Sequence, residues 1–173
     1  EMPCYHKLLI ISDVAVIPLP DFKQKMVQIG YLARTANLLG IATPKIACIA
    51  PSEQLLPNVI SSTEGALLAK MADRGQLGNV VVDGPLSLDV ALYKEVAEHK
   101  KVKGSSVAGD PDCLLFPNLE SANVFFKSVT HLCGGELAAM VMGTKVPCVL
   151  TSRGDTSKTK LFSIALACLA VKK

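Results

Sequence analysis

Charged side chains are scarce in this sequence. Of 173 residues, only 19% are Asp, Glu, Lys or Arg, and the net charge of +3 is spread along the chain. The one tight basic cluster, Lys100, Lys101 and Lys103, is short and has no aromatic residues interleaved with it. A nucleic-acid-binding surface would need a larger basic patch. The cluster therefore predicts a solvated loop, and no nucleic-acid partner is expected.

Long apolar runs and a signal peptide are also missing. Lys or Gly interrupts every apolar stretch before it reaches membrane-spanning length, so no membrane partner is expected. The six cysteines show no CxxC spacing, and a chain of this size needs no disulfide staples. Four of them lie in or beside apolar runs, where we expect small core residues: Cys48, Cys113, Cys148 and Cys168. These features predict a reducing, cytoplasmic compartment.

Two kinds of ligand signature are absent as well. There is no glycine-rich dinucleotide fingerprint, nor the Asp cluster of a metal–hydroxyacid site, which argues against a dehydrogenase. The pairs Cys4/His6 and His131/Cys133 lack a third and fourth ligand at suitable spacing. No metal site and no tightly bound cofactor are predicted.

Half of the residues are hydrophobic, and the apolar pattern alternates between short β-branched runs and helical periodicity. Strands are expected at residues 7–16, 45–50, 80–83, 113–117 and 146–150. Helices are expected at residues 21–39, 63–74, 88–99, 118–132 and 161–171. Asp21 is the expected N-cap of the first helix and Gly40 its stop. This alternation predicts one three-layer α/β/α domain with a mostly parallel sheet.

The last continuous stretch has the pattern strand, turn, helix. Residues 146–150 predict a strand buried on both faces, and residues 161–171, apolar nearly all round, predict a buried helix. The polar turn between them holds Ser152, Arg153 and Asp155. A neutral donor and a forked cation at a helix N-terminus suit a phosphate or carboxylate. The alternative is that Asp155 or Thr156 only caps the helix and Arg153 lies on the surface.

Other polar turns follow the remaining strands, and all are expected at the carboxyl edge of the sheet. Gly84, after Asp83, allows either close approach of a ligand or a tight turn. Asn118 is a good N-cap, and Glu120 suits the first turn of a helix.

Four stretches together resemble the phosphate acetyl/butyryl transferases: VVDGPLSLDVAL, SSVAGDPDCLLFPNLESANVFFK, GELAAMVMGTKVPCVLTSRGDT and SIALACLA. ADRGQLGNVVVDGPL and GTKVPCVLTSR look closer to the butyryl branch. The resemblance implies transfer of an acyl group (butyryl, branched short-chain or acetyl) between coenzyme A and inorganic phosphate, giving an acyl phosphate. It also implies a fold similar to isocitrate and isopropylmalate dehydrogenases, with two α/β domains flanking a cleft.

The resemblance also implies what these 173 residues are. They correspond to the C-terminal portion of the family, with no counterpart to its N-terminal half-domain. The first residue is Glu, not Met, so the chain looks like a fragment or a processed piece. By itself it is expected to have little or no activity, because one wall of the cleft is missing. A homodimer or higher homo-oligomer is expected from the family's habit and the apolar composition.

The family's residue roles are carried over position by position. Ser152 and Arg153 match its catalytic Ser-Arg pair. The acetyl branch places its carboxylate base where this chain has Thr159, and the nearest acid is Asp155, which is equally well explained as a cap. His131 stands where the acetyl branch has an Arg, although a solvated His at a helix end is the commoner outcome. Substrate-binding residues are expected on the cleft wall or edge: Asp83, Gly84, Ser106, Gly109, Asn118, Glu120, Asn123 and His131.

A second function of a different class stays open. Domains of this type are also found as non-catalytic acyl-CoA-binding and dimerisation modules. The missing N-terminal half favours that alternative for the chain as it stands, whereas Ser152 and Arg153 favour catalysis.

Overall fold

The computed structural model describes residues 1–171. Its sheet has four parallel strands in the order β1-β4-β2-β3. The strands are β1 (Ile10–Ser12), β2 (Lys45–Ile49), β3 (Val81–Leu86) and β4 (Cys113–Leu115). The helices are α1 (Phe22–Leu38), α2 (Ile60–Asp73), α3 (Leu88–Leu92), α4 (Lys94–His99), α5 (Leu119–Leu132) and α6 (Ser157–Leu169). The predicted α/β class with a parallel sheet is confirmed.

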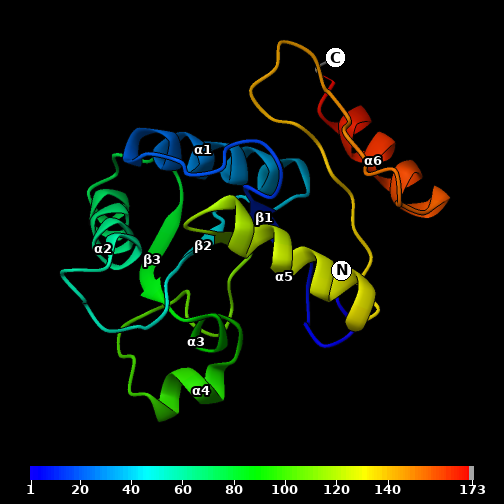
Figure 1. Ribbon diagram of the computed structural model, residues 1–173. Helices are drawn as coiled ribbons and strands as arrows, with labels where there is room; N and C mark the ends of the chain where they lie inside the picture. Colours follow the sequence, from blue (N-terminus) through cyan, green and yellow to red (C-terminus); the bar gives the residue numbers. More distant parts are fainter. Residues whose placement is uncertain (172–173) are drawn as a thin grey trace.

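Helices cover both faces of the sheet, because the central strands β2 and β4 alternate apolar side chains between two cores. Ile46 of β2 and Cys113 of β4 pack against α1 and α2 on one face. Ala47 of β2 and Leu114 of β4 pack against α3, α4 and α5 on the other. Figure 1 shows α1 and α2 on one side of the strands and α3 and α4 on the opposite side.

The predicted caps of the longer helices are confirmed. Asp21 and Gln24 form a capping box at the start of α1, with Asp21 Oδ1 accepting from the Gln24 N–H at 2.8 Å. Gly40 follows the end of α1 with φ +89°, the left-handed conformation that glycine adopts without cost. Asn118 caps α5 as expected.

The helix predicted at residues 88–99 is two short helices. Tyr93, between α3 and α4, has an extended backbone. The Gly109 N–H donates to the carbonyls of Val90 and Ala91 at 3.1 and 2.9 Å, so the loop after α4 takes up the carbonyls at the end of α3. Local periodicity could not reveal this tertiary contact.

The prediction of a buried strand at residues 146–150 is wrong. Among residues 1–171 this segment joins no sheet, and only an isolated antiparallel bridge pairs Val141 with Cys148. Val146 is 69% exposed and Leu150 is 59% exposed. The connecting segment (residues 134–156) instead runs extended away from the sheet (Figure 1).

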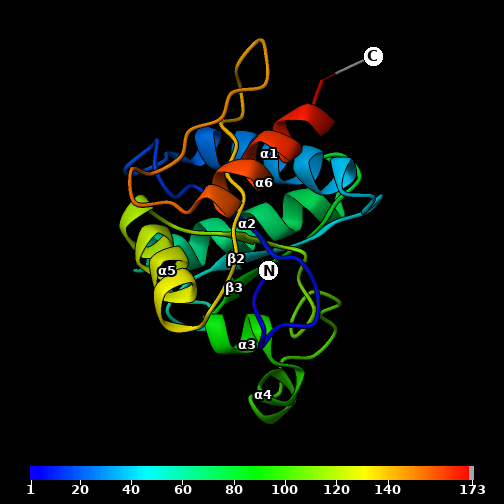
Figure 2. The ribbon, with the colours of Figure 1, turned by 90° about the vertical axis from the view of Figure 1, so that its right-hand side faces the viewer.

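The prediction that the last helix is buried is also wrong. In α6 only Ser163 and Ala167 are buried, while Leu161 is 62% exposed. The helix packs against its own connecting segment, where the Ala139 N–H donates to Ser163 Oγ at 3.0 Å. Figure 1 shows α6 apart from the strands, and in the turned view of Figure 2 it lies in front of α1. The segment is apolar and helical as expected, but within residues 1–171 the helix does not pack on the sheet.

The predicted core cysteines are buried where they belong to the sheet and exposed where they belong to the C-terminal part. Cys48 and Cys113 are buried in the core as predicted, and burial raises the pKa of each thiol to about 12. Cys148 and Cys168 are exposed, which contradicts the core assignment, because both belong to the C-terminal part that leaves the sheet. No helix in the described part of the chain is long and apolar enough to cross a membrane.

Candidate functional site at the carboxyl edge of the sheet

A cavity of about 780 Å³ opens at the carboxyl ends of the two central strands. The chain leaves β2 toward α2 on one face and leaves β4 toward α5 on the other. Where neighbouring parallel strands send their chains to opposite faces, a crevice remains between them, and α/β proteins bind ligands there. The lining residues are Ile49, Ala50, Pro51, Leu88, Phe116, Pro117, Asn118, Glu120, Ser121, Val124, Phe125 and Ser128.

Asn118 fixes the first turn of α5 at the cavity. Its Oδ1 accepts from the Ser121 N–H at 2.9 Å, and the Ser121 hydroxyl donates back to the Asn118 carbonyl at 3.0 Å. The Leu119 N–H donates to the carbonyl of Pro18, which ties the turn to the loop after β1. Cap and tether together hold Glu120 and Ser121 at the cavity wall.

The cavity is chemically one-sided. Most of its lining is aliphatic or aromatic, and it includes no Lys, Arg or His. Its single ionisable residue is Glu120. Such a lining favours an uncharged, apolar ligand group over a phosphate.

Asn123 has a structural role in this chain. Its Nδ2 donates to the Val14 carbonyl at 2.9 Å and fastens α5 to the turn after β1. The same turn is organised by Asp13, whose carboxylate accepts from the N–H groups of Ala15, Val16 and Ile17. Asn123 does not line the cavity.

Ser152, Arg153 and Asp155 form a compact exposed turn before α6. Asp155 Oδ2 accepts from the Ser152 N–H at 2.7 Å, and the Asp155 N–H donates to the Ser152 carbonyl at 3.2 Å. Thr156 caps α6, because its Oγ1 accepts from the Thr159 N–H at 3.1 Å. The Arg153 side chain has no hydrogen bond or ion pair within residues 1–171 and is exposed. Asp155 therefore shapes the turn, and Arg153 presents its charge to solvent.

This turn does not adjoin the cavity. None of its residues lines the space at the carboxyl edge, since the segment before it is no strand of the sheet. The expectation that the Ser152–Arg153 turn would lie along that edge is therefore wrong for this chain.

Close packing between β3, the neighbouring strand β2 and helix α2 leaves no room for a side chain at Gly84. A Cβ there would lie 2.6 Å from the Cys48 Cβ on β2 and 3.3 Å from the Gly65 Cα on α2. Asp83 Oδ1 accepts from the Gly84 N–H at 2.8 Å. In the structure, the missing side chain of Gly84 permits a close approach of strand and helix.

Three further predicted residues lie away from the carboxyl edge. Gly109, with φ +82°, lines a second cavity of about 490 Å³ next to Asp110, ahead of β4 at the amino edge. Ser106 is exposed in the loop before it, and His131 is exposed in the last turn of α5. Of the predicted substrate-binding residues, the structure brings only Asn118 and Glu120 together at one cavity.

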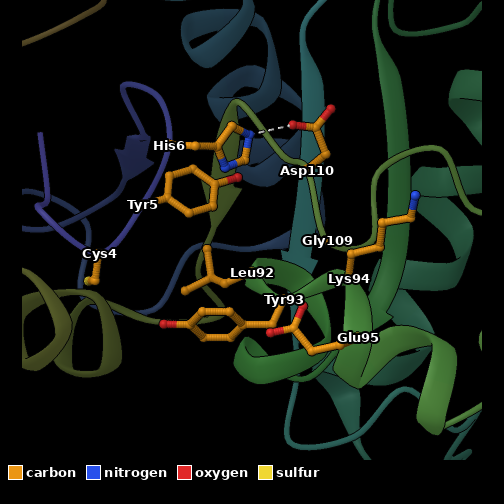
Figure 3. Close-up of a pocket in the computed structure, with 9 residues that line it drawn as sticks. All are labelled: Cys4, Tyr5, His6, Leu92, Tyr93, Lys94, Glu95, Gly109 and Asp110. Carbon is orange, nitrogen blue, oxygen red and sulfur yellow. Dashed lines mark hydrogen bonds and ion pairs between the residues drawn. The ribbon is translucent and has the colours of Figure 1, made fainter.

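The amino-edge cavity carries charges that the sequence reasoning missed. Asp110 receives hydrogen bonds from His6 Nε2 at 2.9 Å and from Lys45 Nζ at 2.6 Å, and Lys7 also pairs with it. Partial burial of Asp110 acts to raise its pKa, but the bonds from Lys45, Lys7 and His6 lower that pKa overall. Figure 3 shows His6 bonded to Asp110, with Tyr5, Tyr93 and Lys94 around the same space. The sequence did contain a signal for this charge cluster, because Lys and Asp residues directly flank the buried strands.

Sequence reasoning also missed the apolar lining of the carboxyl-edge cavity. Phe116 follows β4, Leu88 opens α3, and Val124 and Phe125 lie in the second turn of α5. The signal was present in the FPNLESANVFF stretch, where apolar residues surround the polar cap.

Comparison with known proteins agrees with this architecture. The chain is 43% identical over 169 residues to a phosphate butyryltransferase of Clostridium acetobutylicum, covering 98% of this chain and 56% of that protein. It is 40% identical over 167 residues to a phosphate acetyltransferase of Thermotoga maritima, covering 96% of this chain and 56% of that protein. The crystal structure of a branched-chain phosphotransacylase from Enterococcus faecalis superposes with a TM-score of 0.88 at 30% identity, covering 98% of this chain and 60% of that one.

The chain thus spans somewhat more than half the length of these relatives. A family model described as phosphate acetyl/butaryl transferase matches residues 2–168, nearly the whole sequence. The chain therefore belongs to the phosphate acetyl/butyryl transferase family.

Proposed function

We propose that this chain is part of an enzyme that moves an acyl group between coenzyme A and inorganic phosphate. The observation that carries the proposal is the family match over residues 2–168. The relatives are named for butyryl, acetyl and branched-chain acyl transfer, so the acyl group is expected to be butyryl, branched short-chain or acetyl. Coenzyme A and phosphate are substrates in this reaction, and no tightly bound cofactor takes part.

The reaction sets clear demands on the protein. A phosphate oxygen attacks the thioester carbonyl carbon, the carbon–sulfur bond breaks, and the thiolate leaves and takes up a proton. Arg153 supplies a forked cation for the phosphate, and Ser152 supplies a hydroxyl donor for the oxyanion. The Arg153 side chain is exposed and has no ion-pair partner among residues 1–171, which supports this role. Asp155, already bonded to the Ser152 N–H, holds the pair in place.

We further propose that the chain is the C-terminal part of such an enzyme and that a second wall completes the site. The share of about half of each relative's length supports this. Catalysis across a cleft needs groups on both sides, and a misplacement of about 1 Å costs roughly 100-fold in rate. Alone, the 173 residues should show little turnover.

The test is to join this chain to the part of the Clostridium acetobutylicum relative that it does not match. Release of free thiol from butyryl-, branched acyl- and acetyl-CoA would be followed with and without phosphate. Phosphate-dependent release by the chimera, with little by the chain alone, supports catalysis. Thiol release that does not depend on phosphate would overturn the proposal.

A non-catalytic acyl-CoA-binding module is the second candidate. It is favoured by the separation of the Ser152–Arg153 turn from the carboxyl-edge cavity. If the chimera bound butyryl-CoA but released no thiol, this second candidate would replace the first.

We also propose two properties of the whole molecule. Exposed apolar side chains on α6, such as Leu161 and Ile164, support association into a homodimer or higher homo-oligomer. Sedimentation as a clean monomer at micromolar concentration would contradict it. Six free cysteines support a reducing, cytoplasmic location.

A further inference from the structure

We infer that residues 136–142 form an edge strand, onto which the residues that precede Glu1 in the whole enzyme add as an antiparallel strand. The inference rests on the proposed function, in which these 173 residues are the C-terminal part of a longer enzyme. It names the backbone surface by which the connecting segment, and with it the Ser152–Arg153 turn, is joined to the missing part.

The pairing begins at Glu1. Its nitrogen donates to the Glu136 carbonyl at 2.8 Å, and the Glu136 N–H donates back to the Glu1 carbonyl at 2.9 Å. Two residues that exchange both bonds form the hydrogen-bonded pair of an antiparallel ladder. The approach is close, because a Cβ at Gly135 would lie 3.2 Å from the Glu1 carbonyl oxygen. Glu1 and Glu136 therefore fix the register of any strand that continues from them.

The ladder can continue in one direction only. The Gly135 N–H donates to the Val129 carbonyl at 2.9 Å, so it is not available to Met2. Met2 is buried and its carbonyl accepts from the Tyr5 N–H at 3.1 Å, so the chain turns away from the connecting segment there. Antiparallel strands run in opposite directions. Further pairs therefore place residues that precede Glu1 beside residues 137–142.

One edge of the connecting segment is already bonded within this chain. The Ala139 N–H donates to Ser163 Oγ on α6 at 3.0 Å, and the Val141 N–H donates to the Cys148 carbonyl at 2.8 Å. Both donors lie an odd number of residues after Glu136. In an extended chain, residues at odd and even spacing bond toward opposite edges.

The other edge is free. Ala138 and Met140 lie two and four residues after Glu136, so their N–H and C=O groups face the edge at which Glu1 lies. These groups have no hydrogen-bond partner among residues 1–171. A strand that continues from Glu1 would meet them in register and supply their partners.

The sequence of this edge does not protect it from pairing. Residues 137–142 read Leu-Ala-Ala-Met-Val-Met, with no charge and no proline. Exposed edge strands in native proteins usually carry such residues, because free N–H and C=O groups attract another strand. The chain spans 56% of each curated relative, so the missing part has ample length to supply that strand.

Amide hydrogen exchange, resolved by residue with NMR, tests the free edge. In the chain alone, Ala138 and Met140 should exchange at least about fivefold faster than Ala139 and Val141, because only the latter pair is bonded. In the chimera with the Clostridium acetobutylicum part, Ala138 and Met140 should slow by at least about fivefold and lose that difference.

Three results would overturn the inference. One is equal exchange at all four amides in the chain alone, and another is unchanged exchange at Ala138 and Met140 in the chimera. The third is protection of Ala138 and Met140 that rises with the concentration of the chain alone, which would assign the edge to a second copy.

A cross-strand disulfide tests the register. The residue immediately before Glu1 would lie opposite Leu137 in a pair without hydrogen bonds, with Cα atoms about 4.5 Å apart and within reach of a disulfide. In the chimera, Leu137→Cys should therefore crosslink to a cysteine introduced immediately before Glu1 when oxidised glutathione is added. Ala138→Cys is the matched control and should not crosslink, because its side chain lies on the other face of the strand.

Peptide mass mapping would identify the crosslink. The exposed native cysteines are first changed to Ser: Cys4, Cys133, Cys148 and Cys168. Crosslinking through Ala138→Cys that equals or exceeds that through Leu137→Cys would overturn the register, and the inference with it.

This inference and the proposed function fail separately. Phosphate-dependent thiol release by a chimera that neither protects Ala138 nor crosslinks through Leu137→Cys would overturn the inference and leave the function intact. Protection and crosslinking in a chimera that releases no thiol would support the edge strand and contradict catalysis.

Discussion

Arg153 is the residue on which the chemical proposal depends most. In the chimera, Arg153→Lys should keep the fold but lose the forked geometry, because Lys offers only a point charge. Losing one charge-assisted bond in a water-excluded site should cost about 2–4 kcal/mol of transition-state stabilisation, or roughly 30- to 1,000-fold in rate. Steady-state rates with phosphate varied would measure this loss.

Ser152→Ala is the companion variant. It should lower turnover more than it weakens coenzyme A binding, since the contact tightens as charge develops. The Asp155 bond to the Ser152 backbone survives this change, so the turn should stay formed. Normal kinetics in both variants, with only a lowered melting temperature, would show that the turn has a purely structural role.

Gly84 is the residue where packing leaves no space for a side chain. A Cβ in Gly84→Ala would collide with β2 at Cys48, so the unfolding free energy should fall by about 1–3 kcal/mol. Gly30→Ala is the matched control, because Gly30 in α1 has nothing within 4 Å of its missing Cβ. That variant should gain roughly 0.5–1 kcal/mol from helix propensity. Urea denaturation of the two variants would measure their unfolding free energies. A loss in Gly84→Ala only would show that packing, and not the removal of a glycine as such, causes the destabilisation.

At the scale of elements, a buried ion pair joins α1 to α2. The Lys25 side chain is 6% exposed and bonds to Glu64, which is 20% exposed. Lys25→Ala leaves Glu64 without its partner in a dry interface and should cost about 3–5 kcal/mol. Replacing the pair together, by Lys25→Met with Glu64→Leu, should recover most of that loss.

Chemical denaturation would compare these variants with Lys23→Ala, an exposed lysine in the first turn of α1. That control should change the unfolding free energy by less than about 0.5 kcal/mol. A loss in Lys25→Ala no larger than in the control would mean that the pair does not fix the two helices.

The amino edge of the sheet should give the chain part of its acid sensitivity. Folding lowers the Asp110 pKa through Lys45, Lys7 and His6, despite the opposing effect of burial. A carboxyl group with a lowered folded pKa stabilises the fold above its unfolded pKa of about 3.9 and loses that contribution as the pH falls. Asp110→Asn should therefore be less stable than wild type at pH 7, and the gap should narrow below about pH 4.

Asp73→Asn is the control for this pH series. Its carboxylate is 63% exposed and pairs only with Lys70 within the described chain, so little change is expected at any pH. A gap between Asp110→Asn and wild type that stays constant from pH 7 to pH 3 would show that Asp110 acts by packing and not by charge.

At the scale of the whole molecule, local patterns predicted what local physics controls. The capping box at Asp21, the stop at Gly40 and the cap at Asn118 depend on residues a few positions apart, and all were found. The apolar runs that became β2 and β4 are buried on both faces and also stood out. The break at Tyr93 depends on Gly109, 16 residues later, which no local pattern shows.

The C-terminal part shows the opposite case. Residues 146–171 carry the pattern of a buried strand and helix, yet most of them lie exposed, and none belongs to the sheet among the described residues. Periodicity reports which side chains favour burial, not which surface will cover them. The same reason explains the site: Asn118 and Glu120 were found from one turn, while Leu88, Ile49 and Phe116 meet there only through the fold.

Formation of an acyl phosphate is the most direct measurement of the proposed chemistry. Phosphorus-31 NMR would follow the chimera with butyryl-CoA and inorganic phosphate. We predict a new acyl phosphate resonance that grows in step with free thiol and is lost in Arg153→Lys. Thiol release with no acyl phosphate, or an acyl phosphate formed equally well by Arg153→Lys, would contradict the assignment of this chain to phosphate-dependent acyl transfer through Arg153.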